Sequence, residues 1–92
     1  MSFQIKLSDA SRLDLKEANS YYLDISNNLN TKFKFDISDA IDRITLNLEH
    51  FQKLYRNIKI VFTKTFHVGI HYLVEDETVY IQRILHQKRL YQ

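Results

Sequence analysis

The sequence contains no cysteine, no proline, no tryptophan and a single glycine, Gly69. The absence of cysteine excludes disulfides, thiol catalysis, zinc–thiolate sites and iron–sulfur clusters. With no proline and one glycine, tight turns must be formed by Asn, Asp, Glu and Ser. The chain has no run of roughly 18 apolar residues that could cross a membrane, and its first residues lack the apolar stretch of a secretory signal. We therefore expect a soluble, cytoplasmic protein with no membrane partner.

A chain of 92 residues with 45% hydrophobic residues predicts one domain, covering residues 1–92, with one modest core. Its charge is unevenly distributed. Residues 1–52 hold 6 Lys or Arg and 8 Asp or Glu, whereas residues 53–92 hold 7 and 3. The second part is therefore basic, which favours a polyanionic partner. A basic face that only contacts water is the alternative.

The first third of the chain predicts a strand and a helix. Residues 3–7 alternate apolar and polar side chains, the pattern of a half-buried strand. Ser8 or Asp9 can cap the helix that follows. We expect one face of this helix to be buried, with Asp14 and Glu17 on the other side. The expected buried face comprises Ala10, Leu13, Ala18, Tyr21, Tyr22 and Ile25.

A break at residues 26–30 precedes the clearest element, a second helix with a continuous apolar stripe of about five turns. The stripe comprises Leu29, Phe33, Ile37, Ala40, Ile41, Ile44 and Leu48. We expect Ile41 and Ile44 in the core. Asp36, Asp39 and Asp42 are expected to point away from it.

The rest of the chain predicts three strands, at residues 58–62, 66–74 and 79–87, with a polar turn at residues 75–78. The last strand is apolar on both faces in its first half, which indicates an interior position in the sheet. The order is a strand, an antiparallel helical hairpin and a three-stranded antiparallel meander. We therefore predict an α+β fold with both helices on one face of a single sheet and the other face left for function.

Polar side chains on the strands are the candidates for that function. Lys59, His67, Gly69 and His71 are expected on the face away from the apolar residues of their strands. On the last strand, alternation places Tyr80, Gln82, His86 and Lys88 on one face and Arg83, Gln87 and Arg89 on the other. Alternation alone does not decide which set joins His71, and a bulge would exchange them.

No metal ion or cofactor is expected. His67 and His71 would lie about 13 Å apart in a strand, too far for one ion, and the chain has no phosphate-binding glycine loop. The stronger candidate is His86 with Lys88 and Arg89, because histidine exchanges protons near neutral pH and cations hold phosphates. A solvated basic terminus is the alternative. Tyr91 is a further catalytic candidate if the tail folds back.

The order of these elements resembles the ParE/RelE superfamily of type II toxin–antitoxin toxins, over nearly the whole chain. The matching segments are F3-Q-I-K-L-S8, A10-x-x-x-D14-L-K-E-A18-x-x-Y21-Y22, L29-x-x-K32-F33, A40-I41-x-x-I44, F51-Q-K-L-Y55-R-N-I58-K59, F66-H-V-G69-I70-H-Y72 and V79-x-I81-x-x-I84-L85-H86-x-x-R89. The chain departs from the family's pattern in three places. His67 stands where proline is usual, Lys59 where arginine is common, and Leu90 where proline often follows the final arginine.

The resemblance implies a toxin neutralised by a cognate antitoxin, with one of two targets. ParE-like members poison DNA gyrase, whereas RelE-like members cleave mRNA on the ribosome, which needs charge stabilisation and a proton acceptor. The residues that could supply both are Lys59, Arg83, His86, Arg89 and Tyr91. Basic residues are sparse for a ribosome-dependent nuclease and the helical hairpin is closer to the ParE branch, so we favour gyrase. A member that only forms complexes is a third reading.

Overall fold

The computed structural model describes residues 4–46, 53–55 and 58–86, with the backbone alone for residues 53–55. The elements, in chain order, are β1 (Gln4–Leu7), α1 (Asp9–Ile25), α2 (Asn27–Leu46), β2 (Lys53–Tyr55), β3 (Ile58–Phe62), β4 (Val68–Glu75) and β5 (Thr78–His86). The predicted helical hairpin and the strands on either side of it are confirmed. β2 is one strand more than we predicted.

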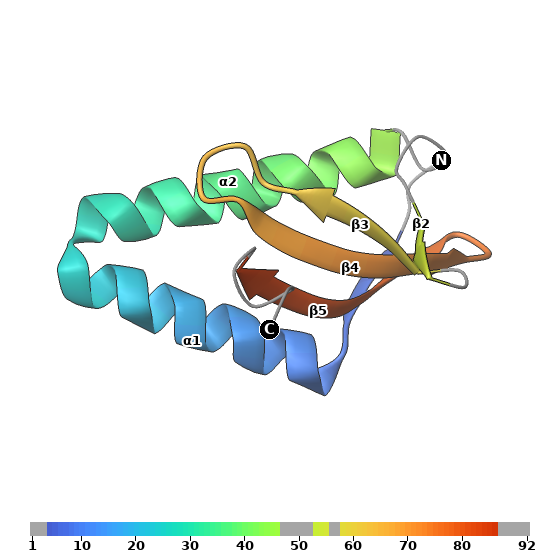
Figure 1. Ribbon diagram of the computed structural model, residues 1–92, viewed down its shortest axis with the longest axis horizontal. Coiled ribbons are helices and arrows are strands. Elements are labelled where there is room, and N and C mark those ends of the chain that lie inside the picture. The colour runs from blue at the N-terminus through green and yellow to red at the C-terminus, as the bar shows by residue number, and fades with distance from the viewer. Residues whose placement is uncertain (1–3, 47–52, 56–57, 87–92) are drawn as a thin grey trace.

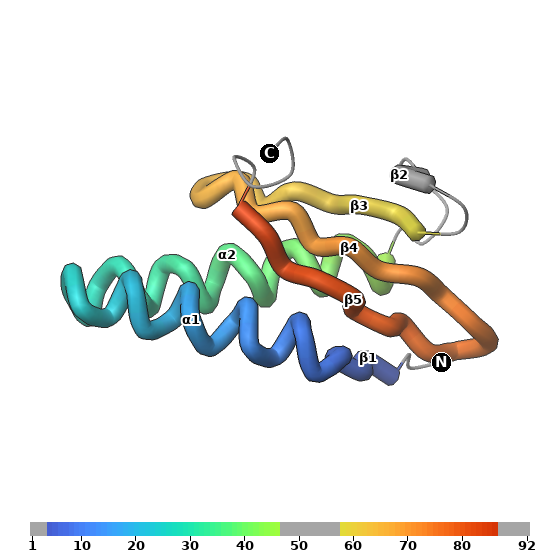
Figure 2. Tube along the Cα trace, turned by 60° about the horizontal axis from the view of Figure 1, so that its bottom comes forward, coloured from blue at the N-terminus to red at the C-terminus, as the bar shows by residue number. Residues whose placement is uncertain are grey.

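The strands form a five-stranded sheet in the order β1-β5-β4-β3-β2. The two helices form a second layer against one face of this sheet (Figures 1 and 2). The pairs β2–β3, β3–β4 and β4–β5 are antiparallel, so the predicted meander is confirmed and is longer by one strand. β1 joins the other edge by pairing in parallel with β5. β5 therefore lies inside the sheet, as its apolar first half predicts.

Serine side chains define the ends of the helices. Ser8 Oγ accepts a hydrogen bond from the backbone N–H of Ser11 at 3.0 Å, which satisfies one of the free donors of the first turn of α1. Ser26 Oγ does the same for the backbone N–H of Leu29, also at 3.0 Å. The predicted break at residues 26–30 is therefore only one residue long, because Ser26 ends α1 and caps α2 at once.

The apolar stripe of α2 forms the centre of the core. Phe33, Ala40 and Ile44 are fully buried and pack with Ile70 of β4 and other strand residues. Ile41 is partly buried and packs against the same cluster. The end of the predicted stripe, Leu48, lies outside the described residues. The 3.6-residue periodicity thus identified the buried face of α2 correctly.

The predicted buried face of α1 is correct only in part. Tyr22 is in the core and Ala18 packs against it, as predicted. Leu13, Tyr21 and Ile25 are more than half exposed, whereas Ser11 and Asp14 are buried. The prediction used apolar residues only. Polar side chains can be buried when they form hydrogen bonds. Ser11 Oγ donates to the carbonyl oxygen of Ser8 at 2.9 Å, and Asp14 binds two residues of β5, as described below.

Asp36 is a second acidic residue predicted to be exposed and found buried, with 7% exposure. Its carboxylate accepts hydrogen bonds from the backbone N–H of Thr65 at 3.2 Å and of Phe66 at 2.7 Å. These bonds fasten the β3–β4 loop to α2. The next residue, His67, has a φ of 54°, a value that the ring of a proline forbids. The loop therefore has a conformation that proline at this position would not allow.

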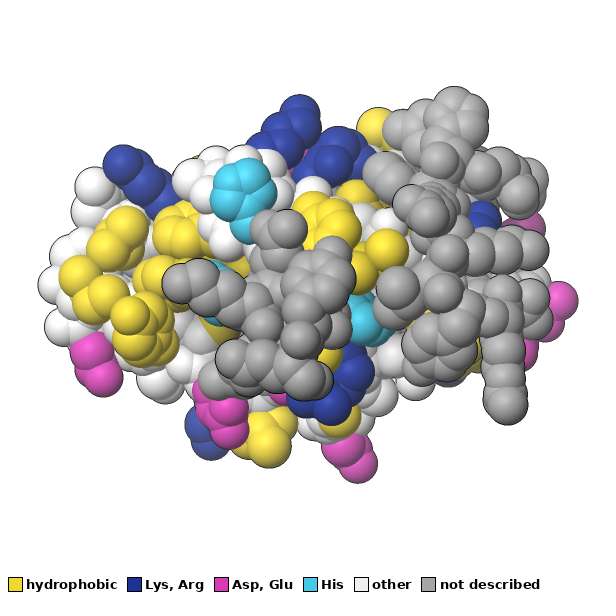
Figure 3. Space-filling view, viewed as in Figure 1, with side chains coloured by type: hydrophobic (Ala, Val, Ile, Leu, Met, Phe, Trp, Pro, Cys, Tyr) yellow, Lys and Arg dark blue, Asp and Glu magenta, His cyan; other side chains and the backbone are white. Residues whose placement is uncertain are grey.

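The helical hairpin extends past the sheet at the end where α1 meets α2 (Figure 1). Apolar side chains gather there on the face seen in Figure 3. Exposed apolar residues in the last two turns of α1 include Tyr21 and Ile25. Among the described residues, no helix is both long enough and apolar enough to cross a membrane.

Candidate functional site

A bulge in β5 decides which of its side chains share a face with His71. Tyr72 of β4 pairs with Ile81, but the preceding residue, His71, pairs with Arg83. Gln82 is the extra residue. Side chains opposite each other in a sheet lie on the same face, so Arg83 lies with His71 on the face turned away from the helices. The sequence could not settle this point, because one inserted residue exchanges the faces of everything after it.

Asp14 of α1 holds this part of β5. Its two carboxylate oxygens accept hydrogen bonds from Arg83, at 2.7 Å from Nε and 3.0 Å from Nη2. Oδ2 also accepts the backbone N–H of Ile84 at 3.0 Å. Arg83 is bound at both of these nitrogens. The hydrogen bond to Asp14 raises the pKa of the Arg83 guanidinium above its ordinary value.

The position of Asp14 follows from the end of β1. The pairing of β1 with β5 stops at Ile81, and the chain then turns into α1, where Ser8 Oγ donates to the carbonyl oxygen of Gln82 at 2.7 Å. Beyond that point no strand lies beside this edge of β5 among the described residues. The buried N–H of Ile84 needs an acceptor, and Asp14 supplies it.

His71 is the buried titratable group of this face, with 9% exposure. Within the described residues, its Nε2 has no hydrogen-bond partner. Burial lowers the pKa of His71, the positive charge of Arg83 lowers it further, and Asp14 acts in the opposite direction. His71 is therefore a neutral imidazole at neutral pH.

His86 lies on the helix side of the sheet, because it pairs with Val68, a core residue. Its Nε2 is 2.7 Å from the hydroxyl oxygen of Tyr22 on α1. The ring of Tyr22 also packs against Phe33 and Phe66, with ring centroids 5.0 and 4.7 Å away. Burial raises the pKa of Tyr22, as do nearby Tyr21 and Asp36. The hydroxyl therefore remains protonated near neutral pH.

Lys59 is not where we expected it. It pairs with Tyr72, so it lies on the side of β3 that also carries the buried Val61, and not on the face of His71. The prediction was wrong because it took the three apolar residues at alternate positions of this strand as the buried set. Lys59 lies opposite Tyr72 of β4, and His86 lies opposite Val68 of the same strand. These two positions on β4 are four residues apart, so Lys59 and His86 are separated by about 13 Å along the sheet.

Three of the five candidate catalytic residues can thus be located, and they do not converge. Arg83 lies on the face turned away from the helices, while Lys59 and His86 lie on the helix side at separated positions. Arg89 and Tyr91 lie outside the described residues, as does Lys88. The described residues contain no group of three or more His, Asp or Glu that could hold a metal ion.

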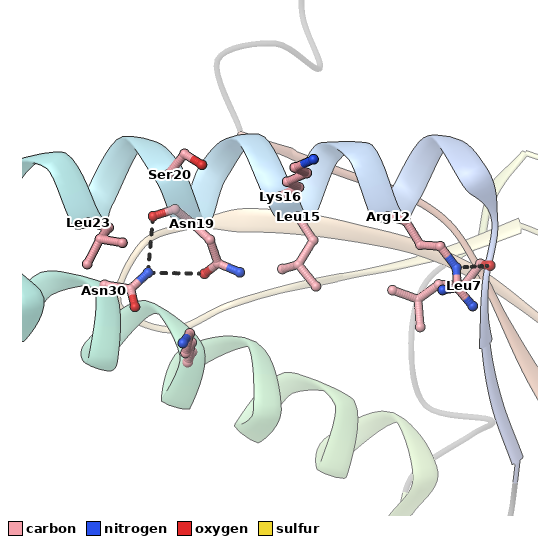
Figure 4. A pocket seen from close by; sticks show the side chains of 9 residues that line it. Leu7, Arg12, Leu15, Lys16, Asn19, Ser20, Leu23 and Asn30 are labelled. Carbon is pink, nitrogen blue, oxygen red and sulfur yellow. Dashed lines mark hydrogen bonds between the residues drawn. The ribbon is translucent and has the colours of Figure 1, made fainter.

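A groove between α1 and α2 is a feature that the sequence analysis missed (Figure 4). It has a volume of about 500 Å³ and is lined by Leu7, Arg12, Leu15, Lys16, Asn19, Ser20, Leu23, Asn30 and Lys34. The available signal was the helical spacing of 12, 16, 19 and 23 on α1, which places these residues on one side of the helix. The net negative charge of residues 1–52 concealed this local basic surface.

Comparison with known proteins now identifies the family. Residues 5–91 match the sequence profile of the ParE toxin of type II toxin–antitoxin systems, parDE. This covers nearly the whole chain, so the protein belongs to the ParE toxin family. A search of curated proteins found no match.

Solved structures show the same fold. The chromosomal ParDE toxin–antitoxin system of P. aeruginosa matches with a TM-score of 0.76 and 14% identity, over 91% of this chain and 95% of that one. A mutant of YafQ from E. coli matches with a TM-score of 0.59 and 16% identity, over 99% and 100%. The toxin–antitoxin complex RelB–RelE of Methanococcus jannaschii matches with a TM-score of 0.56 and 21% identity, over 94% of both chains. Such low identities establish the fold and leave the target open.

Proposed function

We propose that this toxin acts in the cytoplasm on DNA gyrase and is neutralised by a cognate antitoxin. The observation that carries the proposal is the match of residues 5–91 to the ParE toxin family. ParE-like toxins poison gyrase through protein contact, so the surface must bind a protein and need not assemble a catalytic centre.

The positions of the candidate catalytic residues support this choice. Cleavage of RNA requires a base, an acid and cations that all reach one phosphate. Arg83 is held by Asp14 on one side of the sheet, and His86 is held by Tyr22 on the other. Lys59 is on the side of His86 but several residues away along the sheet. These three residues, as they are placed, cannot act on the same phosphate.

A ribosome-dependent mRNA endonuclease is the alternative function. The hydrogen bond between His86 Nε2 and the hydroxyl of Tyr22 favours it, because a tyrosine partner can orient an imidazole for proton transfer. In that case His86, with Arg89 and Tyr91, would carry the reaction. No cofactor is needed for either function.

Two assays on the purified toxin separate these functions. We expect inhibition of gyrase supercoiling and intact mRNA on translating ribosomes. His86→Ala and, as a control in the exposed loop, His67→Asn should both retain the inhibition. Ribosome-dependent cleavage that falls about 10²–10⁴-fold in His86→Ala, without gyrase inhibition, would establish the endonuclease instead.

The antitoxin is tested in cells. Expression of the toxin alone should arrest growth, and co-expression of the protein encoded by the adjacent reading frame should restore growth and yield a complex on purification. Equal growth in both cases, with no complex, would contradict the toxin assignment for this chain.

A further inference from the structure

The outer side of α1 carries exposed apolar and acidic residues in a single row. Leu13, Glu17, Tyr21 and Asp24 are all exposed and follow one another at helical spacing, so they share one side of the helix. Leu13 and Tyr21 are 55% and 62% exposed. None of the four lines the groove between α1 and α2. We call this row the α1 stripe.

A second groove lies at the opposite edge of the molecule, between α2 and the β3–β4 loop (Figure 1). It has a volume of about 540 Å³ and is lined by Lys32, Phe35, Asp36, Asp39, Lys64 and Thr65. Phe35 is the most exposed aromatic residue of the described core elements, with 72% exposure. We call this feature the loop groove.

The two surfaces carry opposite charge. In the loop groove, both oxygens of the buried Asp36 accept backbone N–H groups of the loop, and Asp39 is paired with Arg43 at 3.2 Å. The exposed Lys32 and Lys64 therefore remain for a partner. In Figure 3, Lys and Arg side chains gather along the α2 edge, whereas Asp and Glu side chains are spaced along the α1 edge.

The acids of the α1 stripe are equally available. The ion pairs found among the described residues join Arg43 to Asp39 and Arg83 to Asp14. Within that part of the chain, Glu17 and Asp24 therefore have no ion-pair partner. The molecule thus presents an acidic, apolar helix face on one edge and a basic groove with an exposed aromatic ring on the other.

We propose that the α1 stripe of one molecule binds in the loop groove of a second molecule of the same chain. Glu17 and Asp24 are about 10 Å apart along α1 at 1.5 Å per residue and would approach the two lysines. Tyr21 would pack against Phe35, since aromatic pairs add to the burial of apolar surface. A nucleic acid could satisfy the lysines but would leave the α1 stripe without a partner.

The contact joins two different surfaces that lie on opposite edges. Such a heterologous contact leaves one free surface of each kind at the ends of a pair, so further copies can add. Exposed ion pairs contribute little and are screened by salt. The association is therefore weak, depends on protein concentration and decreases with ionic strength.

The test is sedimentation velocity of the purified toxin from about 1 μM to about 1 mM at low salt. The average mass of the wild type should rise with concentration beyond that of a dimer and fall when salt is added. Glu17→Lys/Asp24→Lys and Lys32→Glu/Lys64→Glu should each raise the Kd of association at least about tenfold, because like charges then meet.

Lys16→Glu/Lys34→Glu is the matched control. It makes the same change in net charge on exposed lysines that line neither the loop groove nor the α1 stripe, and its Kd should stay close to that of the wild type. An equimolar mixture of the two charge-reversed variants should associate again, because each reversed surface then meets its reversed counterpart. Circular dichroism checks that all variants are folded.

A second pair of variants tests the apolar contact. Phe35 and Leu46 are both on α2, with 72% and 79% exposure, but only Phe35 lines the loop groove. Phe35→Ser should raise Kd about tenfold, and Leu46→Ser should leave it unchanged.

Three results would overturn the proposal. The first is a wild type that stays monomeric over the whole range or whose mass stops rising at that of a dimer. The second is wild-type Kd in either charge-reversed variant, or a mixture of the two that does not associate. The third is a monomeric wild type that binds a fluorescent DNA duplex through Lys32 and Lys64, which would assign the loop groove to nucleic acid.

Discussion

Replacing Asp14 with alanine should destabilise the protein, because this buried carboxylate of α1 binds two residues of β5. The variant leaves the buried N–H of Ile84 without its acceptor, which costs about 1–3 kcal/mol. It also removes the partner of Arg83. The Arg83 side chain is 47% exposed, so solvent screening limits this second loss to about 0–1 kcal/mol. The two contributions add to about 1–4 kcal/mol, with a middle value of about 2–3 kcal/mol.

Two further variants separate these contributions. Asp14→Asn keeps an oxygen that can accept from Ile84 N–H but loses the charge, and it should cost about 1 kcal/mol. Arg83→Ala removes the exposed half of the interaction and should cost no more than about 1 kcal/mol. Asp24→Ala is the control, because Asp24 is an exposed acid on the same helix.

The assay is urea unfolding followed by circular dichroism, with thermal unfolding as a second measurement. For a chain of this size, a loss of 2–3 kcal/mol lowers Tm by roughly 10–20 °C. The reasoning would be refuted if Asp14→Ala cost no more than Arg83→Ala. That result would mean that the backbone of β5 does not depend on the carboxylate.

Two other predictions concern the remaining buried polar groups. Asp36→Ala should increase hydrogen exchange of the β3–β4 loop amides and lower the free energy of unfolding by about 2–3 kcal/mol. Asp39→Ala removes only an exposed ion pair and should change neither the exchange nor the stability. Equal exchange in both variants would contradict the anchoring role of Asp36. The folded-state pKa of His71 lies below 6.5, so the unfolded chain binds the proton first and stability is lost as pH falls through that value. His71→Gln should therefore reduce the loss of unfolding free energy between about pH 7.5 and about pH 5. An unchanged pH profile in His71→Gln would rule out this linkage.

The two helices show what periodicity can predict. Most of the buried face of α2 is apolar, so counting apolar residues identifies it, although Asn30 and Asp36 are also buried on this helix. The buried face of α1 includes Ser11 and Asp14, whose partners come from the start of the helix and from β5. Such partners are distant in sequence, and nothing in the local pattern reveals them. The same limitation explains why Asp36 was expected on the surface.

The candidate site shows a further limit. The residue types of Arg83 and His86 were identified from the sequence, but their faces depend on one extra residue in β5. Alternation assumes a regular strand, and a bulge at Gln82 breaks that assumption. The basic groove was missed for a different reason, because Lys34 joins Arg12 and Lys16 only after two helices pack.

The parallel pairing of β1 with β5 has a consequence for the synthesis of this toxin. Gln4 pairs with Thr78, so the first strand has no partner in the sheet until the ribosome has added more than seventy further residues. At 5–20 residues per second this delay is roughly 4–15 s. A prematurely terminated chain without β5 has no strand for β1 to pair with, lacks the residues that hydrogen-bond to Asp14 and lacks an interior strand of the sheet. Translation that stops before β5 therefore yields no folded toxin.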